Sequence, residues 1–114
     1  MLKGKIHNLV VTGANLDYEG SLTLDETLMK AADMRPYEKI DVYNITGGER
    51  FSTYLIKGKE NSGAVEINGA AAHRAKPGDR IIIAAYSLME DEDIEFFRPR
   101  IVMAGENNTI KEIR

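Results

Sequence analysis

The sequence predicts a mainly β protein that folds as a closed barrel with little helix. Short segments that alternate apolar and polar residues, or are rich in β-branched residues, recur along the chain and are separated by Gly, Pro and Asn turns. About six such strands in 114 residues favour a barrel over an open sheet, because closure removes exposed strand edges. No repeat, linker or low-complexity tract interrupts the chain, so we expect residues 1–114 to form a single domain.

The expected strands differ in how strongly the sequence marks them. They lie at residues 2–12, 39–46, 50–57, 64–67, 80–89 and 100–104. The segment 80–89 is the strongest and is almost continuously apolar, which predicts a central strand. Residues 13–15 are interpreted as a turn, because Gly and Asn accept positive φ angles.

One short α-helix is predicted from residue 25 to residue 32. Thr23 or Asp25 caps its start, and Arg35-Pro36 ends it, because the residue before a proline disfavours helical backbone. The small residues that follow Asn68 predict a single helical turn that the Asn68 side chain caps.

Composition excludes several classes of function. Apolar residues make up 43% and charged residues 29%, which is typical of a globular protein. The net charge of −3 gives no basic field, so we expect no nucleic-acid or membrane partner. The absence of Cys excludes disulfides and thiol nucleophiles, and with only two His a metal site would need several carboxylates, so no metal is expected.

Targeting signals are not evident in the sequence. The apolar run near the start, residues 9–11, is too short for a signal peptide. The longest apolar run, residues 81–86, is far below the roughly 20 residues of a membrane span. We therefore expect a cytoplasmic protein.

Three segments stand out as candidates for chemistry, although no phosphate-binding loop, nucleophile elbow or metal motif occurs. They are Gly20-Ser21, residues 50–54 and residues 68–73. Taken singly, each has an ordinary structural interpretation: a turn before a strand, a half-solvated strand, and a turn with an Asn cap. His7 and His73, taken alone, are typical surface or hydrogen-bonded histidines.

Taken together, the segments resemble a known family. The motifs that carry the resemblance are Gly-Lys-Ile-His at 4–7, Tyr-Glu-Gly-Ser at 18–21, Arg-Phe-Ser-Thr-Tyr at 50–54, Asn-Gly-Ala-Ala-Ala-His at 68–73 and Gly-Asp at 78–79. In this order and spacing they resemble the bacterial aspartate 1-decarboxylases, from Leu2 to about Pro99. The resemblance implies a six-stranded double-psi β-barrel with short helices, assembled as a homotetramer. It also implies the conversion of L-aspartate to β-alanine and carbon dioxide for pantothenate synthesis.

Decarboxylation of an amino acid needs an electron sink, which no ordinary side chain provides. The resemblance implies a pyruvoyl group made from Ser21, whose carbonyl forms a Schiff base with the substrate amine. The group would arise by autocatalytic cleavage between Gly20 and Ser21, which leaves a β chain of residues 1–20 and an α chain of residues 21–114. The Ser21 hydroxyl would attack the Gly20 carbonyl, which lacks a Cβ beside it and can sit in a strained peptide. By resemblance, Thr53 donates a hydrogen bond to that carbonyl oxygen.

The substrate carries two carboxylates, so its site favours cations. Arg50 offers a planar fork that matches a carboxylate, and Lys5 offers a point charge. By resemblance both bind substrate, and Tyr54 donates the proton that Cα needs after carbon dioxide leaves. The remaining substrate-binding residues that the resemblance implies are Thr53, Asn68, Gly69, Ala70 and Ala71.

A regular strand raises a geometric conflict within this set. Arg50 and Tyr54 share one face of the strand, and Thr53 points to the other. One site can use all three only if the strand bulges or twists, or if the site lies at a subunit boundary. Weaker candidates for pocket walls from a neighbouring chain are Tyr43, Ile56 and Tyr86. Many relatives carry Trp at the position of Tyr43, which alters the shape of the pocket rather than the chemistry.

Two alternatives to an aspartate decarboxylase follow from the same residues. The first is a non-enzymatic small β-barrel that binds a ligand or protein and keeps its chain intact. The second is a pyruvoyl decarboxylase for another amino acid, since glutamate differs by one methylene, which a pocket discriminates by about 1–3 kcal/mol. Spontaneous maturation and maturation by a helper protein are both compatible with the sequence.

Overall fold

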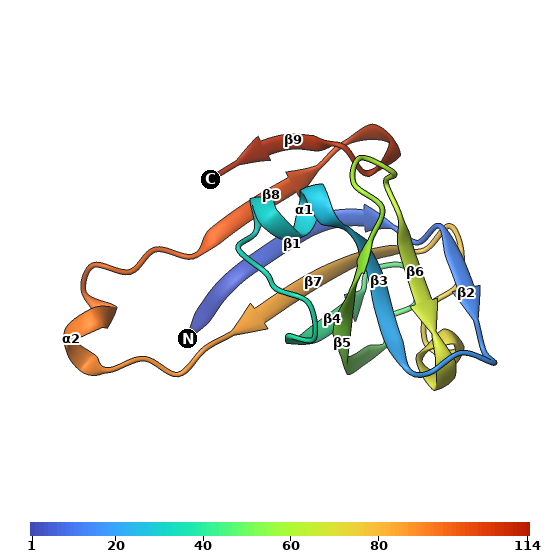
Figure 1. The fold of residues 1–114 in the computed structure, drawn as a ribbon, viewed down its shortest axis with the longest axis horizontal. Helices are drawn as coiled ribbons and strands as arrows, with labels where there is room; N and C mark the ends of the chain where they lie inside the picture. Colours follow the sequence, from blue (N-terminus) through green and yellow to red (C-terminus); the bar gives the residue numbers. More distant parts are fainter.

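The computed structural model describes all 114 residues, as nine strands wrapped around one core with short helical segments between them (Figure 1). The strands are β1 Leu2–Val10, β2 Gly13–Asn15, β3 Ser21–Asp25, β4 Lys39–Asn44, β5 Arg50–Gly58, β6 Val65–Asn68, β7 Arg80–Tyr86, β8 Arg100–Ala104 and β9 Ile110–Ile113. The α-helices are α1 Glu26–Ala31 and α2 Asp91–Ile94, and the 3₁₀ turns are η1 Gly69–His73 and η2 Glu106–Asn108. The predicted mainly β class is confirmed. No helix has the length and apolar character that crossing a membrane requires.

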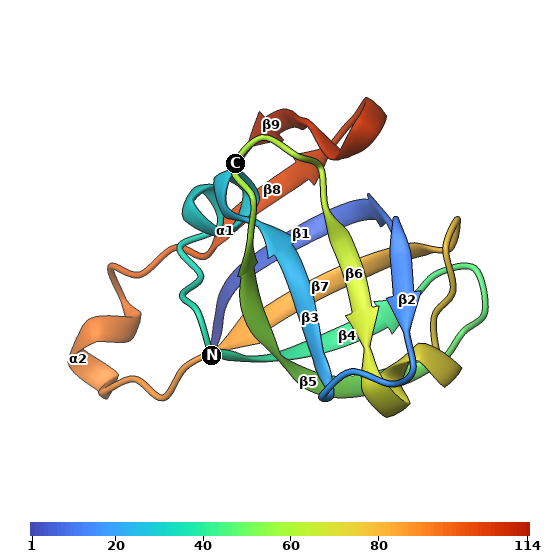
Figure 2. The same cartoon turned by 45° about the vertical axis from the view of Figure 1, so that its right-hand side comes forward.

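The strands are hydrogen-bonded in the order β2-β6-β3-β5-β4-β7-β1-β8-β9. Three neighbouring pairs, β1 with β8, β2 with β6 and β3 with β5, are parallel, and the others are antiparallel. Between β1 and β2, the amide of Val11 donates to the carbonyl of Asp79 and the amide of Thr12 donates to that of Val65. This short link leads from β1 to β2, which lies beside β6 (Figure 2). The arrangement is compatible with a double-psi β-barrel.

All six predicted strands are present, and β2, β3 and β9 are additional. The predicted turn at residues 13–15 is wrong: these residues pair in parallel with Glu66 to Asn68 on β6. Pairing with an available strand edge decides the conformation here, although Gly and Asn alone favour a turn. The strand predicted for residues 80–89 ends at Tyr86.

The helix α1 begins and ends one residue inside the predicted limits. Asp25 rather than Thr23 is its N-cap, because the Asp25 side chain accepts a hydrogen bond from the backbone amide of Thr27. Thr23 instead lies within β3, one of the strands that the sequence pattern did not reveal. Residues 21–25 therefore form a strand of the barrel wall, and α1 begins directly after it.

The core is built from alternate residues of the barrel strands. Its fully buried members include Ile6, Leu22, Val42, Leu55, Ile67 and Ile83. The strand β7 lies between β4 and β1 and contributes Ile81, Ile83 and Ala85 to this core, so the predicted central strand is confirmed. Because every second side chain points inward, most polar residues of the same strands lie on the outer wall.

Candidate active site

The Ser21 side chain is fully buried and hydrogen-bonded on both sides. Its Oγ donates to the backbone carbonyl of Glu19 at 3.0 Å and accepts from Nδ2 of Asn68 at 3.0 Å. One lone pair of the oxygen is left free of these two bonds. The preceding residue, Gly20, is exposed, so the Gly20-Ser21 peptide lies at the boundary between solvent and the buried hydroxyl.

Asn68 reaches Ser21 because β3 and β6 pair antiparallel with these two residues opposite each other. The same Nδ2 also donates to Oγ1 of Thr23 at 3.0 Å, so both of its hydrogens are bonded and the amide is held in place. The predicted helix-cap role of Asn68 is wrong, since its side chain makes no cap hydrogen bond to η1. The amide turns to the two hydroxyls of β3 instead.

Gly69 packs directly against the segment that precedes Ser21. Its φ is +70°, and a Cβ there would lie 2.6 Å from the Gly20 nitrogen and 2.8 Å from the Tyr18 carbonyl oxygen. Only glycine fits both the backbone conformation and the close approach. Gly20 itself does not have a positive φ, and a Cβ on it would meet nothing within 4 Å. The left-handed glycine of this site is therefore Gly69.

Tyr54 lies next to Ser21 across the parallel pair of β3 and β5. The register of that pair starts with Leu22 opposite Leu55, both pointing into the core. One residue earlier on each strand are Ser21 and Tyr54, whose side chains leave the opposite, outer face. The ring of Tyr54 also contacts Tyr37, with centroids 6.5 Å apart.

Thr53 lies on the inward face of β5, away from Arg50 and Tyr54. The pairing of β5 with β4 runs unbroken across these residues, so a bulge does not resolve the conflict that the sequence raised. Leu22 lies opposite Leu55 in the parallel pair of β3 and β5. Two residues before each of them are Gly20 and Thr53, so Thr53 is level with Gly20, the residue just before β3 begins.

Arg50 is exposed at the start of β5 and stacks on a ring of its own chain. The Arg50 guanidinium carbon lies 4.7 Å from the centroid of the Tyr43 ring. The Tyr43 hydroxyl is 2.8 Å from the hydroxyl of Tyr86, and this hydrogen bond, with partial burial, raises the pKa of Tyr43 to about 12. Arg50 makes no ion pair within the chain. Four residues of strand place it roughly 13 Å from Tyr54.

Lys5 is not brought to the Ser21 cluster by its own chain. It lies on β1 between Ala84 and Ile101, and in the sheet β7 and β4 separate β1 from β5. Three strand spacings correspond to roughly 14 Å. Next to it, burial lowers the pKa of His7 from its usual 6.5, and the positive charge of Lys5 lowers it further.

The remaining predicted residues, Ala70 and Ala71, follow Gly69 in η1, with Ala70 exposed and Ala71 half-buried. The sequence interpretation missed Thr23 and the backbone carbonyl of Glu19, which both take part in the Ser21 network. A strand at residues 21–25 would have predicted the role of Thr23, because residues two apart on a strand, such as Ser21 and Thr23, lie on the same face. The Glu19 carbonyl carries no signal in the sequence.

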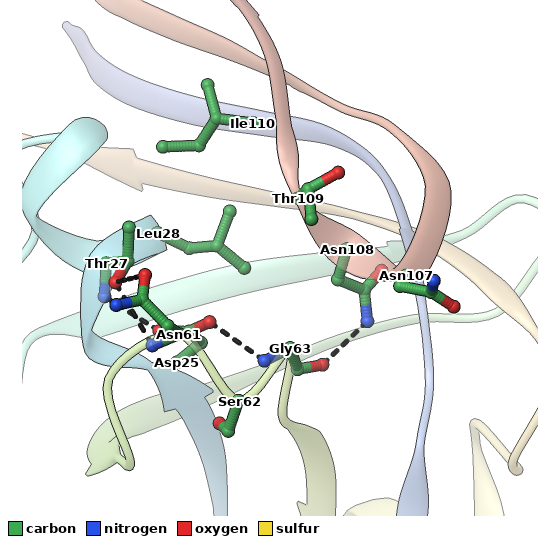
Figure 3. A pocket seen from close by; sticks show the side chains of 10 residues that line it. All are labelled: Asp25, Thr27, Leu28, Asn61, Ser62, Gly63, Asn107, Asn108, Thr109 and Ile110. Atoms are coloured by element: carbon green, nitrogen blue, oxygen red, sulfur yellow. Dashed lines mark hydrogen bonds between the residues drawn. The ribbon is translucent and has the colours of Figure 1, made fainter.

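A second group of buried polar residues lies at the other end of β3, around a cavity of about 380 Å³ (Figure 3). The Asp25 carboxylate accepts hydrogen bonds from the amides of Thr27 at 2.8 Å, Asn61 at 2.9 Å and Gly63 at 2.9 Å. Asn108 donates to the Gly63 carbonyl at 2.9 Å. These bonds join α1 to the β5–β6 loop and η2, so we assign this cluster a structural role.

Comparisons with known proteins agree with the resemblance that the motifs indicate. A family model described as aspartate decarboxylase matches residues 1–111. The chain belongs to the aspartate decarboxylase family. It is 55% identical over 114 residues to the aspartate 1-decarboxylase of Ralstonia nicotianae, covering 100% of this chain and 95% of the relative. Its identity to the enzyme of that name from Cupriavidus necator is 51% over 114 residues, again covering 100% and 95%. It is 50% identical over 113 residues to the aspartate 1-decarboxylase of Desulfotalea psychrophila, covering 99% of this chain and 95% of that relative.

Proposed function

We propose that this protein is a pyruvoyl-dependent aspartate 1-decarboxylase. It cleaves itself between Gly20 and Ser21, then converts L-aspartate to β-alanine and carbon dioxide, and so supplies pantothenate synthesis. The observation that carries the proposal is the buried Ser21 hydroxyl, oriented by Asn68 beside an exposed Gly20 that packs on Gly69. Family membership and the names of the relatives support the choice of aspartate.

The cleavage uses groups of this chain alone. The Ser21 Oγ attacks the Gly20 carbonyl carbon, the peptide C–N bond breaks, and the amine is freed while Gly20 becomes an ester of the serine oxygen. Loss of the Ser21 α-proton then expels the Gly20 carboxylate and leaves dehydroalanine at position 21. Addition of water and release of ammonia leave the pyruvoyl group. Thr53, level with Gly20, is proposed to donate to the carbonyl oxygen as charge develops on it.

The surroundings of Ser21 fit such a group. The Asn68 amide already points two hydrogens at oxygens of β3, and the missing Cβ of Gly69 leaves room for the backbone beside it. When present, a pyruvoyl group supplies a carbonyl that takes up the substrate amine and accepts the electrons of the breaking bond to the carboxylate. Asn68 and Gly69 would hold it, and the small side chains of Ala70 and Ala71 leave the approach open.

Other residues of the chain bind the substrate and return a proton. Arg50 is exposed, has no ion pair and presents a fork that matches a carboxylate. Tyr54, next to Ser21 on the outer wall, is the proposed proton donor to Cα, because its phenol carries an O–H that can donate. Lys5 is the proposed second cation for the substrate.

We further propose that the site lies at a subunit boundary of a homotetramer. Within one chain the backbone of Lys5 is roughly 14 Å from β5 and the Cα of Arg50 is roughly 13 Å from that of Tyr54, so these side chains start from well-separated points on the outer wall. A neighbouring chain that packs on the outer wall brings such residues together without any change in the strands.

The intact mass of the purified protein tests this proposal. We expect two fragments, residues 1–20 and residues 21–114, the second blocked to Edman degradation, and production of β-alanine from aspartate. The variant Ser21→Ala keeps the fold but lacks the attacking oxygen, so we expect neither cleavage nor decarboxylation. A single full-length species that decarboxylates aspartate would sink the pyruvoyl mechanism. A single inactive species after prolonged warming would favour the alternative of a binding module.

A further inference from the structure

The outer face of the barrel carries a hydrogen-bonded pair of tyrosines next to Arg50 that the proposed chemistry does not use. Tyr43 is the β4 residue directly opposite Arg50, and its ring lies under the guanidinium at 4.7 Å. Tyr86, at the end of β7, reaches the hydroxyl of Tyr43 at 2.8 Å. Three neighbouring strands, β5, β4 and β7, therefore each contribute one side chain: Arg50 stacks on the Tyr43 ring, and Tyr43 is hydrogen-bonded to Tyr86.

Stacking on the Tyr43 ring limits the orientations of the Arg50 side chain, which is otherwise exposed. A guanidinium over an aromatic face is attracted to it, and its N–H groups then point outward along its edge. The hydrogen bond to Tyr86 fixes the tilt of the Tyr43 ring, so the position of Arg50 depends on a group that Arg50 does not touch. A free exposed arginine would have to order several rotatable bonds each time it bound an anion.

The one carboxylate in the same cleft is held away from Arg50. The cleft has a volume of about 320 Å³ and is lined by Asp41, Tyr43, Arg50, Phe51 and Ser52. Asp41 accepts a hydrogen bond of 2.6 Å from the Ser52 hydroxyl on the neighbouring strand, and it forms no ion pair with Arg50. The N–H edge of Arg50 is thus left free to bind a carboxylate from outside the chain.

We propose that Tyr43 and Tyr86 are positioning residues for the substrate carboxylate: their hydrogen-bonded pair holds the Arg50 guanidinium ready to bind a dicarboxylate. This inference rests on the proposed function for its choice of ligand. The contact of Tyr43 with Arg50 of its own chain gives these tyrosines a positioning role, and they can still line a pocket of a neighbouring chain.

The test uses the processed protein and two ligands, aspartate for turnover and succinate for binding. Succinate has both carboxylates but no amine, so its dissociation constant, measured by calorimetry, reports on the cations alone. For Tyr86→Phe and for Tyr43→Phe we expect the aspartate KM and the succinate Kd to rise about 2- to 5-fold, with kcat within a factor of about two. Because both changes remove the same bond, the double variant should match either single variant.

A third variant and a control separate positioning from folding. Tyr43→Leu removes the aromatic face itself, so its KM and Kd should rise further, up to about 30-fold. Tyr37→Phe removes a hydroxyl from another exposed tyrosine and should leave both constants unchanged. Unchanged constants in all three Tyr43 and Tyr86 variants, additive effects in the double variant, or no succinate binding by the wild type would each overturn the inference. Wild-type protein that binds succinate but releases no carbon dioxide from aspartate would instead count against the proposed function.

Discussion

The two ends of β3 both carry buried polar side chains, Ser21 at the start and Asp25 at the end, but their surroundings differ. Asp25 accepts three backbone amide hydrogens and joins α1 to the β5–β6 loop. Ser21 has a side-chain amide on one side and a single carbonyl on the other, and it adjoins an exposed glycine. Burial alone does not distinguish a structural polar group from a reactive one.

The partners of the two side chains make the distinction. Backbone amides from three loop and helix positions bind both oxygens of the Asp25 carboxylate and leave it little freedom to react. An Asn side chain that orients the Ser21 hydroxyl leaves an oxygen lone pair free, next to the exposed residue Gly20. The cavity at the Asp25 end is therefore not the place of the proposed chemistry, although it is a well-formed hollow (Figure 3).

The largest effect we expect comes from removing the proposed proton donor at the Ser21 end. Tyr54→Phe keeps the ring, so substrate should still bind and lose carbon dioxide, but return of the proton to Cα should stall. We expect kcat to fall by about 10²–10⁴ with little change in KM. Tyr37→Phe, whose ring contacts Tyr54 at 6.5 Å, is the matched control and should retain activity. If Tyr54→Phe keeps its kcat while KM rises, Tyr54 lines the pocket and another group delivers the proton.

The next effect concerns the close approach at Gly69. A Cβ in Gly69→Ala would lie 2.6 Å from the Gly20 nitrogen, so the segment before Ser21 must move. We expect the rate of self-cleavage, followed by mass spectrometry, to fall about 10²-fold, because the attacking oxygen and the carbonyl carbon lose their alignment.

Gly78→Ala is the control for backbone conformation at Gly69. Gly78 also has a positive φ, +92°, but a Cβ on it meets nothing within 4 Å. Both variants should lose about 1 kcal/mol of unfolding free energy from the unfavourable φ, and only Gly69→Ala should cleave slowly. Equal cleavage rates in the two variants would show that the contact with Gly20 is not needed for processing.

At the other end of β3 we expect an effect on stability and none on chemistry. Asp25→Ala removes the acceptor for three amides and the cap of α1, so the free energy of unfolding should fall by about 2–4 kcal/mol. Urea unfolding measures this loss. At a temperature where the variant is folded, it should cleave at the wild-type rate, and a variant that is folded but uncleaved would contradict the structural assignment.

The smallest effect should come from another structural carboxylate, Asp79. Hydrogen bonds from the Asn44 side chain and then the Lys76 amide lower the pKa of Asp79 below its usual 3.8. Below pH 3.8 the unfolded chain binds this proton more readily than the folded one, so stability should be lost as the pH falls through the folded pKa. Asp79→Asn, which has no such titration, should show a shallower decline below pH 3.8 in urea unfolding measured at several pH values. An identical decline in both proteins would exclude Asp79 as its source.

The sequence by itself determined the β class, six of the nine strands and the family, since these depend on local pattern, turn residues and motifs in fixed order. Hydrophobic alternation marks a strand such as β7 wherever it lies in the fold. The same local information gave the wrong conformation for residues 13–15 and predicted no strand at residues 21–25, because pairing with β6 decides both.

Only the tertiary structure decided how the site residues meet. The Ser21 hydroxyl faces Asn68, the Gly69 backbone touches Gly20, and Arg50 lies on Tyr43 because of strand register between segments distant in sequence. A shift of register by one residue would turn each side chain to the opposite face. Register is set by the packing of the whole core, through buried residues such as Leu22 and Leu55, and so no short motif contains it.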